Sequence, residues 1–311
     1  MTTTLLPRHV PITVAYRGGH PENIHHGSVA VVDASGRLLA SVGDIETPLF
    51  TRSSLKPFQA MPLIAQASER YQLDDADLAL LCASHSGEPM HVQRVAALLH
   101  KIGASESALA CGTHVPFFFG ATGTSPESGA RFSALHHNCS GKHTGMLMLA
   151  NVLGASQVDY LDPHHPVQQQ IAASVSHFSG VPVPQLVSGI DGCSAPNYAL
   201  PLRALAHAFA RLTQDAPDTL YGSAPLRIAR AMSRHPELGA EDHSGKVEHA
   251  RMPPIHRPFK GCFEAMGDGA GTIAAGQVVR AVLPILSPER MQAPGVIMGK
   301  TDLHRRRAPV R

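Results

Sequence analysis

The chain has 311 residues, of which 43% are hydrophobic and 16% charged, and its formal net charge is +2. This length is enough for one domain with a sizeable core, and the small net charge argues against nucleic acid or an anionic membrane as a partner. The first residues lack the pattern of a signal peptide, no apolar run is long enough to span a bilayer, and the five cysteines favour reduced thiols in the cytoplasm.

The N-terminal part of the chain predicts an antiparallel hairpin. Residues 12–16 form a short β-run, and two longer runs over 26–33 and 37–42 flank Ala34-Ser35-Gly36. Glycine at the end of this tripeptide permits the positive φ that hairpin turns require. We therefore expect a small β-sheet to precede the first helix.

Apolar residues at helical spacing predict most of the remaining elements. The first group of helices is expected over 55–70, 74–81 and 88–102, with Asp74 as an N-cap and Pro89 opening the third helix. Further along, helices are expected over 143–153, 163–178, 199–212 and 224–233, with strands at 186–191 and 278–286.

We find no internal repeat and no low-complexity linker, so one compact domain is predicted over 1–286. Residues 287–311 turn to Pro, Gly, Met and Arg, and this composition is typical of a loosely packed basic tail.

Ser53 and Lys56 stand three residues apart at the predicted start of a helix. Residues at this spacing share a helix face, so the amine of Lys56 can reach the hydroxyl of Ser53. A lysine becomes a base for a serine nucleophile once burial or nearby positive charge lowers its pKa. Serine β-lactamases and penicillin-binding proteins use this S-x-x-K pattern, although the pattern alone is common.

Two further segments contain thiols. His136–His143 places Cys139 and Lys142 in front of an apolar helix, and Asp191-Gly192-Cys193 follows a predicted strand, where glycine permits a sharp turn. Thiolates are strong zinc ligands. No sequence spacing shows that the two cysteines meet, however, and a half-buried thiol in a polar turn explains the first segment equally well.

A third segment, Cys82–Glu88, is small and polar after an apolar run. Ser84 makes it a candidate for chemistry. The alternative is structural, with Ser84 or Ser86 capping the helix that begins near Pro89.

Taken together, four motifs in this order resemble the bacterial asparaginase II family of the Rhizobium etli type. They are Arg52-Ser53-Ser54-Leu55-Lys56-Pro57, Ala83-Ser84-His85-Ser86-Gly87-Glu88, His137-Asn138-Cys139-Ser140-Gly141-Lys142-His143 and Gly189-Ile190-Asp191-Gly192-Cys193-Ser194. The likeness covers roughly residues 10–240. It implies an α+β fold similar to that of serine β-lactamases and glutaminases, in which helices flank an antiparallel sheet.

The same resemblance implies hydrolysis of L-asparagine to L-aspartate and ammonia by a homodimer. Ser53 and Lys56 would form one catalytic Ser-Lys pair, and Ser84 would be the serine of a second. The resemblance further implies a zinc ion held by Cys139, Lys142 and Cys193, and a substrate site lined by Arg52, His143 and Asp191.

These residue types suit the implied roles. Lysine ligates a metal only as the neutral amine, and a bound Zn²⁺ itself favours that form of Lys142. The Arg52 guanidinium offers a fork for a substrate carboxylate, and its positive charge favours the neutral form of Lys56.

The chain departs from the family pattern after about residue 240. The family has a Lys-x-Gly-Ala-Glu-Gly segment that supplies the second catalytic lysine, and the nearest match here is Lys260-Gly261-Cys262-Phe263-Glu264-Ala265. Lys260 is therefore the candidate for that role, although the small central residues differ.

Two alternatives remain open. A catalytically impaired relative would keep ligand or zinc binding while lacking the second Ser-Lys pair. A penicillin-interactive serine hydrolase is the other, but the sequence contains no S-D-N or K-T-G segment to support it.

Overall fold

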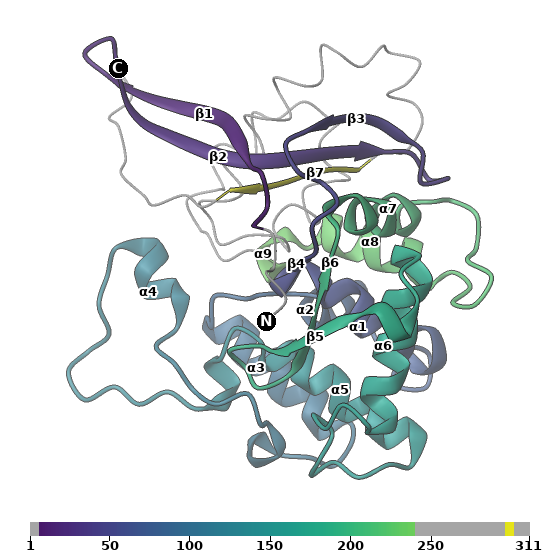
Figure 1. Cartoon of the computed structure of the whole chain (residues 1–311). Coiled ribbons are helices and arrows are strands. Elements are labelled where there is room, and N and C mark those ends of the chain that lie inside the picture. The colour runs from purple at the N-terminus through teal and green to yellow at the C-terminus, as the bar shows by residue number, and fades with distance from the viewer. Residues whose placement is uncertain (1–5, 240–295, 302–311) are drawn as a thin grey trace, which may run out of the picture.

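The computed structural model describes residues 6–239 and 296–301. In these ranges the chain forms a body of helices and two small antiparallel sheets, so the predicted α+β class is confirmed (Figure 1). No described helix has the length and apolar character needed to cross a membrane.

The first sheet is built around the long strand β2 (His20–Val32). Its first half pairs with β1 (Val10–Arg17), and its second half lies between β3 (Leu38–Val42) and β7 (Val296–Thr301). Gly18 and Gly19, both with positive φ, turn β1 into β2. The three predicted strands are confirmed, but the polar, exposed start of β2 has no hydrophobic pattern and was not predicted.

The second sheet lies lower in the view of Figure 1, nearer the helices. Its central strand is β6 (Pro196–Leu200), which pairs with β4 (Leu49–Phe50) and β5 (Val187–Ile190). The strand expected at 186–191 is thus confirmed.

The helix expected over 199–212 begins later than predicted. Residues up to Leu200 belong to β6, and α7 (Leu202–Leu212) starts only after Pro201. Proline disfavours helical backbone at the residue before it, so Leu200 stays extended. The apolar residues before Pro201 fit a helix as well as a strand, so the prediction extended the helix too far back.

The helices confirm the remaining predictions over the described residues, with shifted ends. The long ones are α1 (Lys56–Ala67), α2 (Asp75–Leu81), α3 (Pro89–His100), α5 (Ser140–Leu153), α6 (Pro166–Ser179) and α8 (Ala224–Arg234). The short ones are α4 (Phe117–Thr122) and α9 (Pro236–Gly239), with 3₁₀ turns at Arg52–Leu55, Glu106–Ala108, Ala134–His136 and Val183–Gln185.

Two of these ends place site residues. Arg52–Leu55 forms a 3₁₀ turn, so Ser53 lies just before α1 and Lys56 is the first residue of that helix. Helix α5 begins at Ser140, so Lys142 and His143 lie in its first turn.

Helix α1 lies at the centre of the helical body, where it packs against α5, α6 and α8. Phe58 of α1 contacts the rings of Phe178 and Phe209, at 5.4 Å and 5.2 Å between centroids. Helix α7 carries Phe209 and also packs on β2 and β7, which joins the first sheet to the helices. The start of α1 is therefore held by the core of the protein.

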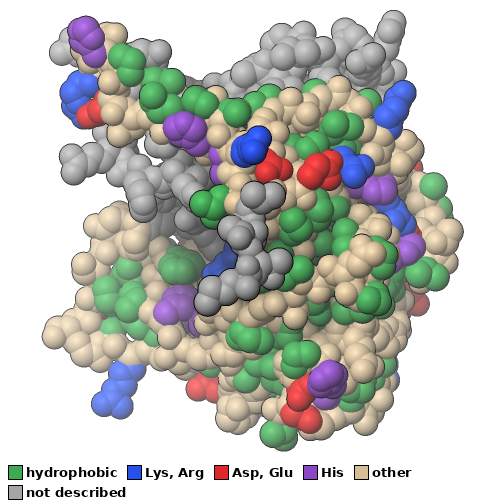
Figure 2. Space-filling view, viewed as in Figure 1, with side chains coloured by type: hydrophobic (Ala, Val, Ile, Leu, Met, Phe, Trp, Pro, Cys, Tyr) green, Lys and Arg blue, Asp and Glu red, His purple; other side chains and the backbone are tan. Residues whose placement is uncertain are grey.

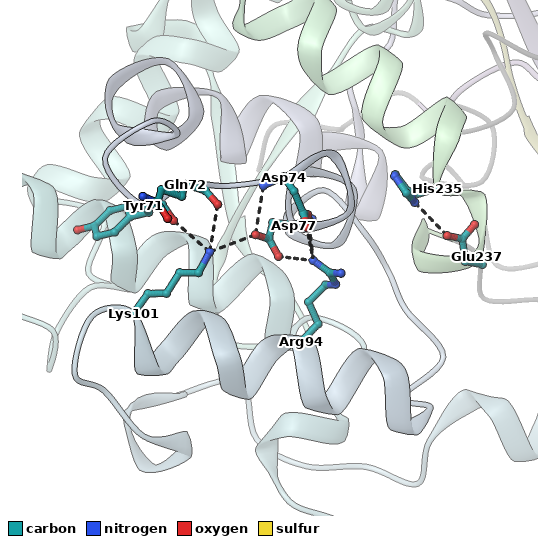
Figure 3. Close-up of polar contacts among 8 residues, drawn as sticks. All are labelled: Tyr71, Gln72, Asp74, Asp77, Arg94, Lys101, His235 and Glu237. Atoms are coloured by element: carbon teal, nitrogen blue, oxygen red, sulfur yellow. Dashed lines mark hydrogen bonds and ion pairs between the residues drawn. The ribbon is translucent and has the colours of Figure 1, made fainter.

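Charged side chains fasten α2 to α3 (Figure 3). Asp74 caps α2 as predicted, since its side chain accepts a hydrogen bond from Asp77 N. Arg94 forms ion pairs with both aspartates, at 2.9 Å and 2.6 Å, and Lys101 lies 3.3 Å from Asp77. These charged groups pair with one another and so stabilise the packing of α2 against α3, the two helices that flank the loop over 82–88.

The loop around α4 extends away from the helical body (Figure 1). It carries exposed hydrophobic side chains, among them Val115 and Phe117. Hydrophobic side chains are visible over this part of the molecule in the space-filling view (Figure 2).

Some predictions lie outside the described residues. Lys260 and the strand expected at 278–286 are among them. Within 287–311 the structure describes only β7, so the domain limit at 286 and the loose tail stay predictions.

Candidate active site

Side chains from all four sequence motifs meet at the start of α1. Direct contacts join Ser53 to Ser84, Arg52 to Asp191, and Lys142 to Cys193. These residues come from the turn before α1, the loop before α3, the first turn of α5 and the turn between β5 and β6. The sequence predicted the individual motifs, and the fold assembles them.

The two candidate serines share a hydrogen bond. Ser53 Oγ donates to Ser84 Oγ over 3.3 Å, and Asn138 Nδ2 donates to the same Ser84 oxygen over 2.8 Å. The backbone of the two loops is also joined, since His85 N donates to Asn138 O. Ser84 therefore lies within the site and does not cap α3. That cap is formed by Glu88 and His91, which corrects the structural alternative for this segment.

Arg52 and Asp191 form an ion pair of 2.6 Å at the edge of the site. Arg52 has a φ of 54°, a left-handed conformation that is uncommon for a residue with a side chain. Asn197 holds this backbone by accepting from Arg52 N and donating to Arg52 O, over 3.1 Å and 3.0 Å. Asn197 was missed in the sequence, where its one signal is a polar residue within the apolar strand β6.

Lys56 is buried, with 1% of its surface exposed, and its Nζ has no hydrogen-bond partner among the described residues. The expected hydrogen bond to Ser53 is therefore not part of the described structure, although the two residues adjoin at the helix start. A buried ammonium or amine without a partner is costly, so this atom marks a place for a ligand or a further side chain.

Cys139, Lys142 and Cys193 form a compact cluster. Lys142 Nζ donates to Cys193 Sγ over 2.9 Å. A hydrogen bond from Cys193, together with the positive charges of Lys56 and Lys142, holds the pKa of Cys139 well below its usual range. Sharing that proton with Cys139 raises the pKa of Cys193. These pKa directions favour a thiolate at Cys139, a thiol at Cys193 and an ammonium at Lys142.

The charge of Lys142 follows from its neighbours. Burial opposes the ammonium, but the nearby sulfur atoms of Cys139 and Cys193 outweigh burial and raise the pKa of Lys142. Cys111 lies near the same cluster, where burial raises its pKa to about 12 and its thiol donates to the carbonyl of Ala134.

The two sulfur atoms suit zinc, whereas the Lys142 nitrogen can be a ligand only after it has lost its proton. No group of three or more His, Cys, Asp or Glu side chains in the described ranges is placed to hold a metal ion. A zinc site here therefore depends on Lys142 as its third ligand, with a fourth position left for another group.

Two buried histidines flank the cluster. His143 Nδ1 lies 2.7 Å from Tyr160 Oη, while His143 Nε2 is buried and has no hydrogen-bond partner in the described ranges. His85 Nε2 lies 2.9 Å from Ser140 Oγ, and His85 Nδ1 accepts from Gly87 N. Burial holds the pKa of both imidazoles well below the usual range, so both are neutral at pH 7.

Nine of the ten predicted site residues lie in the described ranges, and Lys260 is the exception. The nine are Arg52, Ser53, Lys56, Ser84, Cys139, Lys142, His143, Asp191 and Cys193. The structure adds Asn138, Tyr160 and Asn197, which were not singled out in the sequence. Asn138 lies within a recognised motif, whereas Tyr160 stands in a turn-rich segment without any pattern.

Comparison with known proteins places the chain in a family. Residues 13–252 match the family model of L-asparaginase II, and no curated protein matches the chain. The match contains every described site residue and ends before Lys260. Because it covers more than half of the 311 residues, the chain belongs to the L-asparaginase II family.

Proposed function

We propose that this chain hydrolyses L-asparagine to L-aspartate and ammonia, with Ser53 as its nucleophile. One observation carries the proposal. Within a chain of the L-asparaginase II family, the hydroxyls of Ser53 and Ser84 are hydrogen-bonded beside a buried lysine whose amine lacks a partner among the described residues. Within that family we favour the Rhizobium etli type, with a fold related to serine β-lactamases.

The reaction needs an activated nucleophile and a proton for the departing ammonia. Ser53 Oγ attacks the side-chain carbonyl carbon of asparagine, the C–N bond breaks, and the nitrogen departs as ammonia with the proton that Ser53 released, which leaves an aspartyl ester on Ser53. Water then cleaves the ester and releases aspartate. Ser84 accepts the hydrogen bond of Ser53, so it lies on the route by which the hydroxyl proton departs. Lys56 is the proposed acceptor of that proton, a role for which its amine must first release the ammonium proton.

The Arg52–Asp191 pair suits the other end of the substrate. An amino acid carries an α-carboxylate and an α-ammonium, and the pair offers one group of opposite charge to each. Arg52 is largely exposed, with 61% of its side-chain surface open, so a ligand can reach its guanidinium beside Asp191. His143 is the third proposed substrate contact, because its Nε2 has no described protein partner.

A zinc ion held by Cys139, Lys142 and Cys193 is part of the proposal. Once bound, zinc supplies positive charge that can polarise a carbonyl oxygen. The thiolate at Cys139 favours binding of such a cation. We also propose a cytoplasmic homodimer, which gel filtration with light scattering tests directly. Lys260 stays the candidate for the second catalytic lysine.

The proposed function is tested by ammonia release from the purified full chain with L-asparagine and with L-glutamine. We expect stoichiometric ammonia and aspartate from asparagine, and loss of both in Ser53→Ala. Zinc or asparagine binding without ammonia release would instead support the catalytically impaired relative. The same assay with a chelator distinguishes a catalytic metal, whose removal stops turnover, from a structural metal.

A further inference from the structure

Tyr160 is a buried residue that connects His143 to the loop before α4. Its ring meets the His143 ring nearly edge-on, with centroids 5.7 Å apart, and Tyr160 Oη lies 2.7 Å from His143 Nδ1. Tyr160 Oη also accepts a hydrogen bond from Ala110 N over 2.9 Å. The Tyr160 backbone is held in turn by Gln168, whose Nε2 donates to Tyr160 O over 2.9 Å.

These contacts determine where the proton of His143 lies. A tyrosine hydroxyl has one proton to donate, and neutral imidazole has one nitrogen that donates and one that accepts. Ala110 N already donates to the oxygen, so the hydroxyl proton needs an acceptor. His143 Nδ1 is the one acceptor within reach among the described residues. The network therefore leaves the imidazole proton on Nε2.

The opposite tautomer leaves a buried group unsatisfied. If His143 Nδ1 carried the proton, it would donate to Tyr160, and the hydroxyl proton of Tyr160 would have no described acceptor. Tyr160 is fully buried, so water cannot take that proton from the surface. Burial also raises the pKa of Tyr160, which keeps the hydroxyl protonated. An unpaired buried donor is strongly disfavoured.

The second ring nitrogen of His143, Nε2, is then a hydrogen-bond donor without a described partner. His143 Nε2 faces a different side of the ring from Nδ1, the nitrogen that meets Tyr160, and it is fully buried. His143 directly follows Lys142 in the first turn of α5, which places it at the candidate site. A neutral N–H in this position suits an oxygen acceptor, such as a carbonyl or carboxylate of an amino acid amide.

We propose that Tyr160 is a positioning residue, which holds His143 with its proton on Nε2 and so makes it a hydrogen-bond donor to a substrate oxygen. The identity of that substrate rests on the proposed function. The tautomer itself does not, because it follows from hydrogen bonds within the protein.

The first test is therefore independent of activity. Long-range ¹H–¹⁵N spectra of the full chain with labelled histidine distinguish the two tautomers, and His143→Gln assigns the signal. We expect His143 to carry its proton on Nε2 and to become a mixture of tautomers in Tyr160→Phe. A proton on Nδ1 in the unmodified protein, or an unchanged tautomer in Tyr160→Phe, overturns the proposal.

The second test uses kinetics. Tyr160→Phe should lower kcat/KM for asparagine about tenfold, the effect of one lost hydrogen bond, and should cause no further loss in a His143→Gln background. Tyr71→Phe is the matched control, since it removes a buried hydroxyl that bonds Asn151 at the far end of the same helix α5, over 2.6 Å. Additive losses in the double variant contradict a role through His143. If the chain releases no ammonia, the proposed function fails, and the tautomer measurement still decides the role of Tyr160.

Discussion

Ser53 and Ser84 lie 31 residues apart in the chain, yet Ser53 Oγ donates a hydrogen bond to Ser84 Oγ over 3.3 Å. The contact joins the turn before α1 to the loop before α3. It connects two motifs that share no sequence pattern. The roles proposed for both serines depend on this contact.

Replacing Ser84 by Ala tests the second half of that contact. We expect kcat for asparagine to fall about 10²–10³-fold, the usual effect of losing a group that transfers a proton. KM should change little, because Ser84 is assigned to proton transfer. Steady-state ammonia release measures both, with Ser107→Ala as a control on an exposed serine outside the site. A variant with normal kcat would remove Ser84 from the mechanism.

Lys56 and Lys101 should respond in opposite ways to removal of their charge. Lys56→Met should abolish activity, because it removes the proposed proton acceptor. Since the Lys56 amine has no described partner in the core, the same substitution should leave the free energy of unfolding unchanged or raise it by up to about 3 kcal/mol. Lys101 donates to Tyr71 O and pairs with Asp77, so Lys101→Met should cost about 1 kcal/mol and keep activity. Urea denaturation and ammonia release measure both effects. Marked destabilisation by Lys56→Met would show that its amine is satisfied in the folded protein.

Stability should fall as the pH drops below about 6.5. Burial lowers the pKa of His85 and His143 in the folded protein, whereas in the unfolded chain both titrate near 6.5. The unfolded state therefore binds more protons on acidification, and each histidine costs about 1.4 kcal/mol per pH unit below that value, until the folded pKa is reached. Above about pH 6.5 the two imidazoles are neutral in both states, and their contribution to stability no longer changes with pH.

Urea denaturation at about pH 7.5 and about pH 5.5 measures this dependence. His85→Gln should reduce the slope, while His164→Gln, an exposed control, should leave it unchanged. A stability that is flat over this range would contradict neutral, buried imidazoles.

Zinc binding should release protons from the thiol cluster. Cys193 is a thiol and Lys142 an ammonium in the metal-free protein, and both must lose a proton to become ligands. We expect about two protons per zinc near neutral pH, and weaker binding with about one proton in Lys142→Met. Zinc titration in weak buffer with a pH indicator counts them. Equal affinity and proton release in both proteins would exclude Lys142 as a ligand.

Local patterns in the sequence predicted the parts of this protein that depend on neighbouring residues. Asp74 caps α2 because its side chain reaches the next turn, and Pro89 opens α3 because it needs no backbone donor there. The four motifs were recognisable because each is a short contiguous run of residues.

Contacts between residues far apart in the sequence could not be predicted from such local patterns. Asn197 holds the backbone of Arg52 across 145 residues, and Tyr160 meets His143 across a turn without periodicity. The start of α7 was misplaced for a similar reason, because the apolar run through Leu200 fits a buried strand and a buried helix equally well. Burial of Lys56 without a described partner also depends on packing around α1, which composition does not reveal.

The most direct test of the central claim is whether Ser53 becomes covalently attached to the substrate. Asparagine turnover by the unmodified chain, quenched in acid during the first turnover and followed by peptide mass spectrometry, should show one aspartyl group on the peptide that contains Ser53. The same treatment of Ser53→Ala should show none. Ammonia release that continues in Ser53→Ala, with no adduct at Ser53 in the active protein, would contradict a serine nucleophile at this position.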